Sequence, residues 1–269
     1  MKRAYNPSVT WRRFRSILLS VAVVVLVASV ARAQEIRVLT SGGFAAALHD
    51  LVPALEAKTQ RKIMTLEGST LANGPDSIPG RLQRGDAVDV VIMSASGLDD
   101  LIRAGKIFAG TRADLARSGI GMAVRAGAPK PDISSLAALK QTLLRAKSIA
   151  YSSSISGVYL TTELFPRLGI AEQVAGKSIK VDARERVGAV VARGEAEIGF
   201  QQTSELVSIP GIVYVGALPP EAQRVTVFAA GIAVSSANLD VARTVIAFLA
   251  SESARQAISK SGLDPAVSR

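Results

Sequence analysis

Cysteine is absent from this sequence of 269 residues, and histidine occurs once, as His49. Without cysteine the chain can form no disulfide, has no thiol nucleophile and lacks the residue on which a lipoprotein anchor is built. A zinc site of the usual histidine and cysteine type is also excluded. No P-loop or dinucleotide-binding glycine pattern occurs. The sequence therefore predicts no metal site and no cofactor.

The first 33 residues predict a cleavable secretory leader. Five basic residues lie among the first 15, an apolar run follows from Ile17 to Val30, and Ala31 and Ala33 suit a signal peptidase that cuts after Ala33. The alternative is an uncleaved anchor, but a membrane span needs about 20 apolar residues and this uncharged stretch is shorter. The arginine pair Arg12-Arg13 leaves twin-arginine export open beside the Sec route. We expect a monomer, free in a Gram-negative periplasm.

Removing the leader lowers the net charge. The chain carries 32 basic and 22 acidic residues, a formal charge of +10, and six of the basic residues but none of the acidic ones lie within residues 1–33. The mature chain would therefore hold 26 basic and 22 acidic residues, a charge of +4. Its basic residues are dispersed among acidic ones, without an arginine-rich run, so we expect no nucleic-acid partner.

From Glu35 onward, short apolar runs alternate with amphipathic stretches, which predicts an α/β fold with mostly parallel sheets flanked by helices. The predicted strands are Ile36–Thr40, Ile63–Glu67, Val88–Met93, Ser148–Tyr151, Ile179–Val181, Ile198–Phe200 and Ile212–Val215. The predicted helices are Phe44–Ala57, Leu98–Ala104, Val158–Leu168, Val187–Arg193 and Leu239–Leu249.

Two long extended segments, Gly119–Gly127 and Val225–Val234, separate these runs and predict two lobes joined by two crossings. Residues 34–120 and 230–269 would form the first lobe, and residues 121–229 would form an inserted second lobe. Such a double crossing is a natural hinge.

Four strand-to-helix junctions are rich in serine, threonine and glycine. In parallel α/β sheets these carboxyl-end junctions line the ligand crevice, and helix N-termini with hydroxyls beside them suit an anion. Each hydroxyl could instead be an ordinary helix cap. The candidate residues are Ser41, Gly42 and Gly43; Ser69 and Thr70; Ser94; and Ser154, Ser156 and Gly157.

Charged and amide side chains follow two later strands. Arg184 and Arg186 come after the strand Ile179–Val181, where a guanidinium could grip a carboxylate or simply pair with a neighbouring acid. Gln201 and Gln202 follow the strand Ile198–Phe200 and could donate to a ligand or finish a turn. Catalytic residues are not identifiable, although Glu67 or Tyr151 could transfer a proton on a bound organic acid.

The chain resembles the periplasmic solute-binding proteins of type II topology, and more narrowly the molybdate-binding proteins of ABC importers. The residues that carry this resemblance are Ile36–Leu48, Gly68–Thr70, Gly85–Ala95, Ser156–Tyr159 and Arg193–Gly199. The resemblance implies a two-lobed fold, a small anionic ligand between the lobes and a membrane permease as partner.

The sequence departs from the molybdate-binding pattern at the residues that hold the oxyanion. Ser69 matches the second serine of that family, but Gly43 takes the place of the first serine and Gln202 that of a tyrosine. Added arginine and glutamine favour a small carboxylate. The segments Ser41–Ala47, Asp89–Met93, Arg125–Pro129 and Gly199–Gln202 are similar to a subgroup related to periplasmic aconitate isomerase.

Two functions therefore remain open. The leading hypothesis is a periplasmic substrate-binding protein of an ABC-type importer that closes its lobes over a molybdate-like oxyanion or a small polycarboxylate. The alternative is an aconitate isomerase that moves a double bond by a 1,3-proton shift on the same scaffold. Binding of a macromolecular partner is a third possibility.

Overall fold

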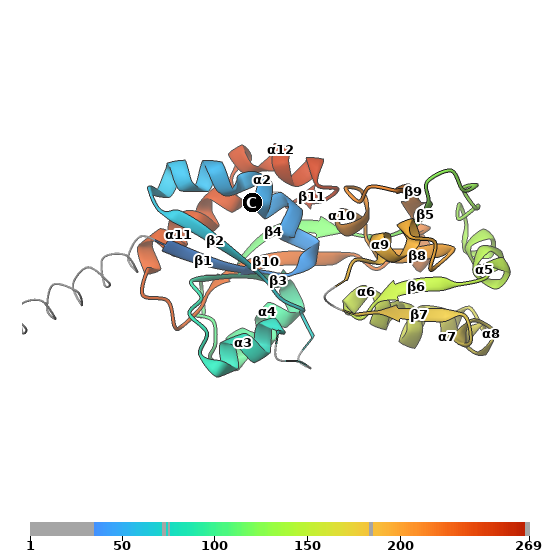
Figure 1. Ribbon diagram of the computed structural model, residues 1–269. Helices are drawn as coiled ribbons and strands as arrows, with labels where there is room; N and C mark the ends of the chain where they lie inside the picture. Colours follow the sequence, from blue (N-terminus) through green and yellow to red (C-terminus); the bar gives the residue numbers. More distant parts are fainter. Residues whose placement is uncertain (1–34, 72–73, 75, 183–184, 267–269) are drawn as a thin grey trace, which may run out of the picture.

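A computed structural model describes residues 35–71, 74, 76–182 and 185–266, which form two lobes lying side by side (Figure 1). Each lobe is built on one sheet with helices on its faces, so the two-lobed α/β fold is confirmed. The predicted leader, residues 1–33, lies outside the described residues and stays a prediction. Within the described part of the chain, no helix combines the length and apolar character needed to cross a bilayer.

The first sheet has six strands in the order β11-β4-β10-β3-β1-β2. Its strands are β1 (Glu35–Thr40), β2 (Lys62–Glu67), β3 (Val90–Ser94), β4 (Ala113–Ser118), β10 (Thr226–Ile232) and β11 (Asp264–Pro265). Strand β1 pairs in parallel with β2 and β3, whereas β10 pairs antiparallel with both β3 and β4. The carboxyl ends of β1, β2 and β3 therefore meet at one edge.

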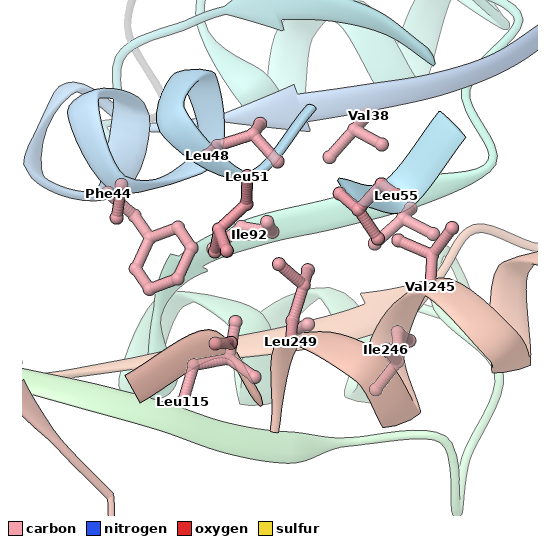
Figure 2. Close-up of a cluster of buried hydrophobic side chains, with 14 of the residues drawn as sticks. Val38, Phe44, Leu48, Leu51, Leu55, Ile92, Leu115, Val245, Ile246 and Leu249 are labelled. Carbon is pink, nitrogen blue, oxygen red and sulfur yellow. The ribbon is translucent and has the colours of Figure 1, made fainter. Parts of the chain in front are cut away.

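Helices cover both faces of this sheet. They are α2 (Gly42–Thr59), α11 (Leu239–Leu249) and α12 (Glu252–Lys260) on one face, and α3 (Ile78–Arg84) and α4 (Ala95–Arg103) on the other. The apolar residues Phe44, Leu48, Leu51 and Leu55 recur at helical spacing, which gives α2 one buried stripe. Figure 2 shows this stripe meeting residues of the sheet and of α11. The N-terminus of α2 is thereby fixed at the carboxyl edge.

The second sheet has five strands in the order β7-β6-β8-β5-β9. They are β5 (Ile120–Arg125), β6 (Ile149–Ser152), β7 (Ser178–Val181), β8 (Ile198–Gln202) and β9 (Ile212–Ala217). The surrounding helical segments are α5 (Leu136–Arg145), α6 (Ile155–Tyr159), the π-helical turn η1 (Leu160–Leu164), α7 (Phe165–Arg167), α8 (Ala171–Ala175), α9 (Val187–Ala192), α10 (Thr203–Leu206) and the 3₁₀ turn η2 (Pro220–Ala222). Strand β6 pairs in parallel with β7 and β8, and β5 pairs antiparallel with β8 and β9.

The two crossings lie between β4 and β5 and between β9 and β10 (Figure 1). The side chain of Gln223 joins them: its Oε1 accepts from the Ile120 amide at 2.7 Å and its Nε2 donates to the Ile120 carbonyl at 3.0 Å. Because β10 begins at Thr226 within the first sheet, the second crossing ends a few residues before the predicted boundary at 229/230.

Most strands of each sheet run in one direction, so the predicted fold of mostly parallel sheets flanked by helices is confirmed. The strands that run against this direction include the two that follow the crossings. Strands β5 and β10 enter their sheets from the other lobe and run against the strands that they join. The parallel strands nevertheless end at the cleft, which is the feature that positions the site.

Candidate functional site

A cavity of about 1100 Å³ lies between the lobes. All four predicted hydroxyl-rich junctions contribute to its wall. Its lining at the strand ends consists of Ser41, Gly42 and Gly43 by β1; Glu67, Gly68, Ser69 and Thr70 by β2; Ser94 by β3; Ser152, Ser153 and Ser154 by β6; Lys180, Val181 and Asp182 by β7; and Gln201 and Gln202 by β8. Both lobes therefore face the same space.

Unused hydrogen-bonding atoms concentrate on this wall. Among the described residues, four buried side-chain polar atoms have no hydrogen-bond partner, and three of them belong to lining residues: Ser41 Oγ, Ser153 Oγ and Arg81 Nε. A buried polar atom without a partner costs roughly 1–3 kcal/mol. Two hydroxyls and one guanidinium N–H, contributed by both lobes, are thus available to a polar ligand.

Ser41 places its hydroxyl at the start of the longest helix that borders the cleft. It is the N-cap of the 18-residue helix α2, but its side chain makes no capping hydrogen bond. Ser41 is only 4% exposed, and its own amide is bound to the Ile92 carbonyl at 2.8 Å. The first N–H groups of a helix lack partners within it and carry a partial positive charge. This helix start can therefore receive an anionic group.

The aromatic ring of Phe228 leaves no room for a side chain at position 43, which explains the glycine there. A Cβ atom at this position would lie 2.3 Å from Cζ of Phe228, a cleft-lining residue of β10. A serine cannot fit there while the Phe228 ring occupies the space. The departure from the molybdate-binding pattern at Gly43 therefore has a steric reason.

Arg186 reaches across the cleft from the residue before α9. Its Nη2 donates to Glu67 Oε2 of the first lobe at 3.0 Å, and its Nη1 lies 3.4 Å from Glu205 Oε1 and from the Gly42 carbonyl. The guanidinium side chain is 34% exposed. Two carboxylates of the protein thus occupy the positions in which an arginine can hold the carboxylates of a ligand.

Glu205 is the most buried carboxyl group of the wall. It belongs to the short helix α10 and is 8% exposed. Desolvation raises the pKa of Glu205 to about 7, against the attraction of Arg186 and the hydrogen bond from Gln201, which lower it. A Cβ on Gly42 would lie 2.5 Å from Glu205 Oε1, so the glycine permits this close approach. At neutral pH the group can both release and accept a proton.

The charged lining residues are Glu67, Asp76, Arg81, Lys180, Asp182, Glu185, Arg186 and Glu205. Acids outnumber bases in this set, so net charge alone does not select an anion. A preference for an anion must come instead from the hydrogen-bond donors that have no partner within the described part of the protein. The helix start at Ser41, the Ser153 hydroxyl and the Arg81 N–H offer such donors.

Several predicted site residues are engaged with the protein. Ser94 Oγ caps α4 by accepting from the Gly97 amide at 3.3 Å, and Ser69 Oγ accepts from the Leu71 amide at 3.3 Å. Ser154 Oγ lies 2.7 Å from Ser152 Oγ. These hydroxyls line the cleft together with Thr70 and are partly satisfied within it.

Three other predicted site residues, Ser156, Gly157 and Gln202, are held by close contacts with other parts of the protein. Among the described residues, Ser156 and Gly157 do not line the cavity; Ser156 Oγ is buried 2.9 Å from Ser152 Oγ, and a Cβ on Gly157 would meet the Ser152 carbonyl. The amide of Gln202 contacts Thr226 Oγ1 at 2.9 Å and, with its NH₂ turned to the hinge, the Ser118 and Gly119 carbonyls at 3.1 and 3.2 Å. Gln202 therefore spans the crossings while bordering the cleft.

Of the remaining candidates among the described residues, Gln201 and Glu67 line the cleft and Tyr151 does not. Gln201 accepts from the Val187 amide at 3.0 Å and donates to Glu205 Oε1 at 2.9 Å, so it positions Glu205. Arg184 lies outside the described residues.

Sequence reasoning missed Arg81, Ser153, Glu205 and Phe228. Ser153 lies in the hydroxyl-rich run that was singled out, and Glu205 follows Gln202 by three residues, so proximity to a strand end was a usable signal for both. Arg81 lies on α3, a helix that the sequence pattern did not predict. Within the described residues, no group of three or more histidine, aspartate and glutamate side chains is placed to hold a metal ion.

Comparisons with known proteins agree with this architecture. An aconitate isomerase from Pseudomonas sp is 46% identical over 228 residues, which cover 85% of this chain and 87% of the relative. The periplasmic molybdate-binding protein of Azotobacter vinelandii has a similar structure, with a TM-score of 0.69 at 18% identity over 87% of this chain and 100% of that chain. A periplasmic thiamin-binding protein gives a TM-score of 0.65 at 16% identity over 87% and 84% of the two chains.

The two structural likenesses show a shared fold, and the first confirms that this fold resembles that of a molybdate-binding periplasmic protein. The sequence model of bacterial extracellular solute-binding proteins matches residues 36–264, nearly the whole described chain. The chain therefore belongs to the family of bacterial extracellular solute-binding proteins.

Proposed function

We propose that the protein binds a small polycarboxylate of the aconitate class in the cleft between its lobes. The observation that carries this proposal is Arg186. Its guanidinium faces the cleft and already holds two carboxylates of the protein, Glu67 Oε2 at 3.0 Å and Glu205 Oε1 at 3.4 Å. A ligand carboxylate that replaces Glu67 would meet the same donor from the same side.

The dimensions and donors of the cleft favour an organic acid over a tetrahedral oxyanion. A volume of about 1100 Å³ is just above the range of about 300–1,000 Å³ that is typical of pockets for organic ligands. Free donors come from several directions, at the Ser41 helix start, at Ser153 and at Arg81. A tricarboxylate can use three such points at once. The relative at 46% identity is named for aconitate, which is a tricarboxylate.

The predicted leader and the absence of cysteine support a periplasmic location without a lipid anchor. As a solute-binding protein of this kind, the chain would close over its ligand and present it to the permease of an ABC-type importer. The two crossings, joined by Gln223, provide the hinge for that closure.

A thermal-shift screen tests the ligand class. We expect citrate, aconitate and tricarballylate to raise the melting temperature and molybdate, sulfate and phosphate to leave it unchanged. A ligand at about 100 times its dissociation constant stabilises the folded state by about 2.7 kcal/mol. That corresponds to roughly 5–10 °C for a protein of this size.

Arg186→Met keeps an unbranched side chain that matches the stem of arginine and removes the guanidinium, so the carboxylate-induced shift should disappear. Arg243→Met is the matched control, because Arg243 is 64% exposed on α11 and pairs with Asp240 outside the cleft. A shift with molybdate alone, or an Arg186→Met protein that responds as the wild type does, would contradict the proposal.

A second candidate function, isomerisation of aconitate, is favoured by two observations. The relative that is 46% identical is an aconitate isomerase, and the cleft contains a buried carboxyl group, Glu205, whose pKa is about 7. Incubating the purified protein with trans-aconitate and following the cis isomer by proton NMR tests this function. Binding without conversion would leave transport as the function.

A further inference from the structure

We propose that Glu205 is the proton-transferring residue of an aconitate 1,3-proton shift in this cleft. This inference rests on the second proposed function and deepens it. It begins from position: Glu205 is a carboxyl group buried in the wall of the ligand cavity, at the point where α10 of the second lobe meets the N-terminus of α2 from the first.

The two oxygens of Glu205 have different surroundings. Oε1 accepts from Gln201 Nε2 at 2.9 Å and lies 3.4 Å from Arg186 Nη1. Oε2 makes no hydrogen bond with any residue in the described part of the chain. One oxygen is therefore anchored and sets the direction of the carboxyl group, and the other is left to take up a proton.

The helix α10 is itself held in place beside the cleft. Ser204 Oγ donates to the Gly43 carbonyl at 2.8 Å, which ties α10 to the start of α2. Gly42 allows Glu205 to approach that helix start, because a Cβ there would lie 2.5 Å from Oε1. Glu205 is thus positioned by contacts from both lobes.

The chemistry needs one group that acts first as base and then as acid. The ionised Glu205 carboxylate takes a proton from the methylene carbon of aconitate, and the C–H electron pair enters the allylic system that is conjugated with the ligand carboxylates. Protonated Glu205 then gives a proton to the former vinyl carbon, forming a C–H bond there while the double bond moves to the former methylene carbon; exchange of the carboxyl proton with solvent between the two steps brings deuterium into the ligand in D₂O. Glu205 ends as a carboxylate, and no oxidant or further reactant is needed.

The surrounding charges suit both halves of this transfer. The intermediate carries additional negative charge on its carboxylates, which Arg186 and the helix start at Ser41 can stabilise. Burial raises the pKa of Glu205 to about 7, so the ionised and protonated forms are both populated at neutral pH. Glu67 pairs with Arg186 on the other side of the guanidinium. The other charged groups on the wall are Asp76, Arg81, Lys180, Asp182 and Glu185.

Glu67 is the competing candidate on the opposite lobe. Its side chain is 59% exposed and is paired with Arg186 Nη2 at 3.0 Å. Glu67 is therefore open to water, whereas Glu205 is 8% exposed within the wall of the cavity. Burial distinguishes Glu205 from Glu67.

The test compares Glu205→Gln, Glu205→Asp and the exposed control Glu252→Gln. Conversion of trans-aconitate and exchange of its methylene hydrogens in D₂O are followed by proton NMR. Binding of tricarballylate, which has no double bond to move, is measured by calorimetry. We expect Glu205→Gln to lose at least 100-fold in both reactions, in the range of a lost acid–base group, while binding tricarballylate within about threefold of wild type.

Glu205→Asp should retain more activity than Glu205→Gln, with an altered pH profile, and Glu252→Gln should match the wild type. Asp at this position also keeps the inference testable if the glutamine variant does not fold. Glu205→Gln activity above one tenth of wild type, or an Asp variant no more active than the Gln variant, would overturn the assignment. A wild type that binds tricarballylate yet neither converts nor exchanges aconitate would instead overturn the isomerase function, and the assignment with it.

Discussion

Glu205→Gln should remove a pH-dependent loss of stability from the empty protein. The carboxyl group is nearly isosteric with the amide, so the change mainly removes ionisation from a buried position. In the wild type, burial raises the pKa of Glu205 from 4.5 to about 7. Between these two values the folded state holds a proton that the unfolded state has released, so the free energy of unfolding falls as the pH rises through this window.

The size of the effect follows from the two pKa values. One pKa unit corresponds to about 1.4 kcal/mol, so complete ionisation of Glu205 destabilises the folded state by about 3 kcal/mol. Most of this loss, about 2 kcal/mol, falls between pH 5 and pH 8. For a protein of this size 2 kcal/mol corresponds to roughly 4–8 °C in melting temperature. The glutamine variant should escape this loss.

The assay is thermal melting followed by circular dichroism at several pH values, in buffers without carboxylates. The melting temperature of Glu205→Gln minus that of the wild type should increase from pH 5 to pH 8. Glu252→Gln, which changes an exposed carboxylate on α12, should show no such trend. A difference that stays constant with pH, or that decreases as the pH rises, would refute the reasoning about Glu205.

Three further predictions concern the wall of the cleft. Glu67→Gln should tighten polycarboxylate binding two- to fivefold in a calorimetric titration, because it removes an exposed partner of Arg186 worth up to about 1 kcal/mol; weaker binding would show that Glu67 assists the ligand. Ser41→Ala should weaken binding about three- to tenfold without lowering the melting temperature, since its buried hydroxyl has no partner to lose. The control Ser135→Ala removes the cap of α5, so it should lower the melting temperature without weakening binding. Gly43→Ser should destabilise the fold by about 1–3 kcal/mol in urea denaturation, because its Cβ would overlap the Phe228 ring; an unchanged midpoint would remove the steric explanation.

Most of the fold could be predicted from the alternation of short apolar runs with amphipathic stretches. The helix Leu239–Leu249 has the predicted bounds, and the parallel strands β1, β2 and β3 lie where apolar runs predict them. The helix α12 was missed because only Ala254 and Ile258 of its nine residues are buried, which leaves little apolar periodicity to detect. Strands β5 and β10 lie within the two predicted extended segments, but their direction was not predicted, because it depends on the path between lobes, which local sequence does not encode.

The site was predictable where it depends on strand ends. Ser41 follows β1 directly and Arg186 lies in the segment between β7 and α9, and both line the cleft. Glu205 could not be predicted in the same way, because its position beside Gly42 of the first lobe depends on how the two lobes meet. The hinge contact of Gln202 depends on that meeting too, since its partners come from both crossings.

Calorimetric titration of tricarballylate into the ligand-free protein tests the central claim most directly. Binding should be measurable for the wild type and for Arg243→Met, and it should be lost in Arg186→Met, whose guanidinium faces the cleft. Molybdate should give no heat of binding under the same conditions. Tight binding of molybdate with none of tricarballylate, or equal tricarballylate affinity in Arg186→Met and wild type, would contradict the account.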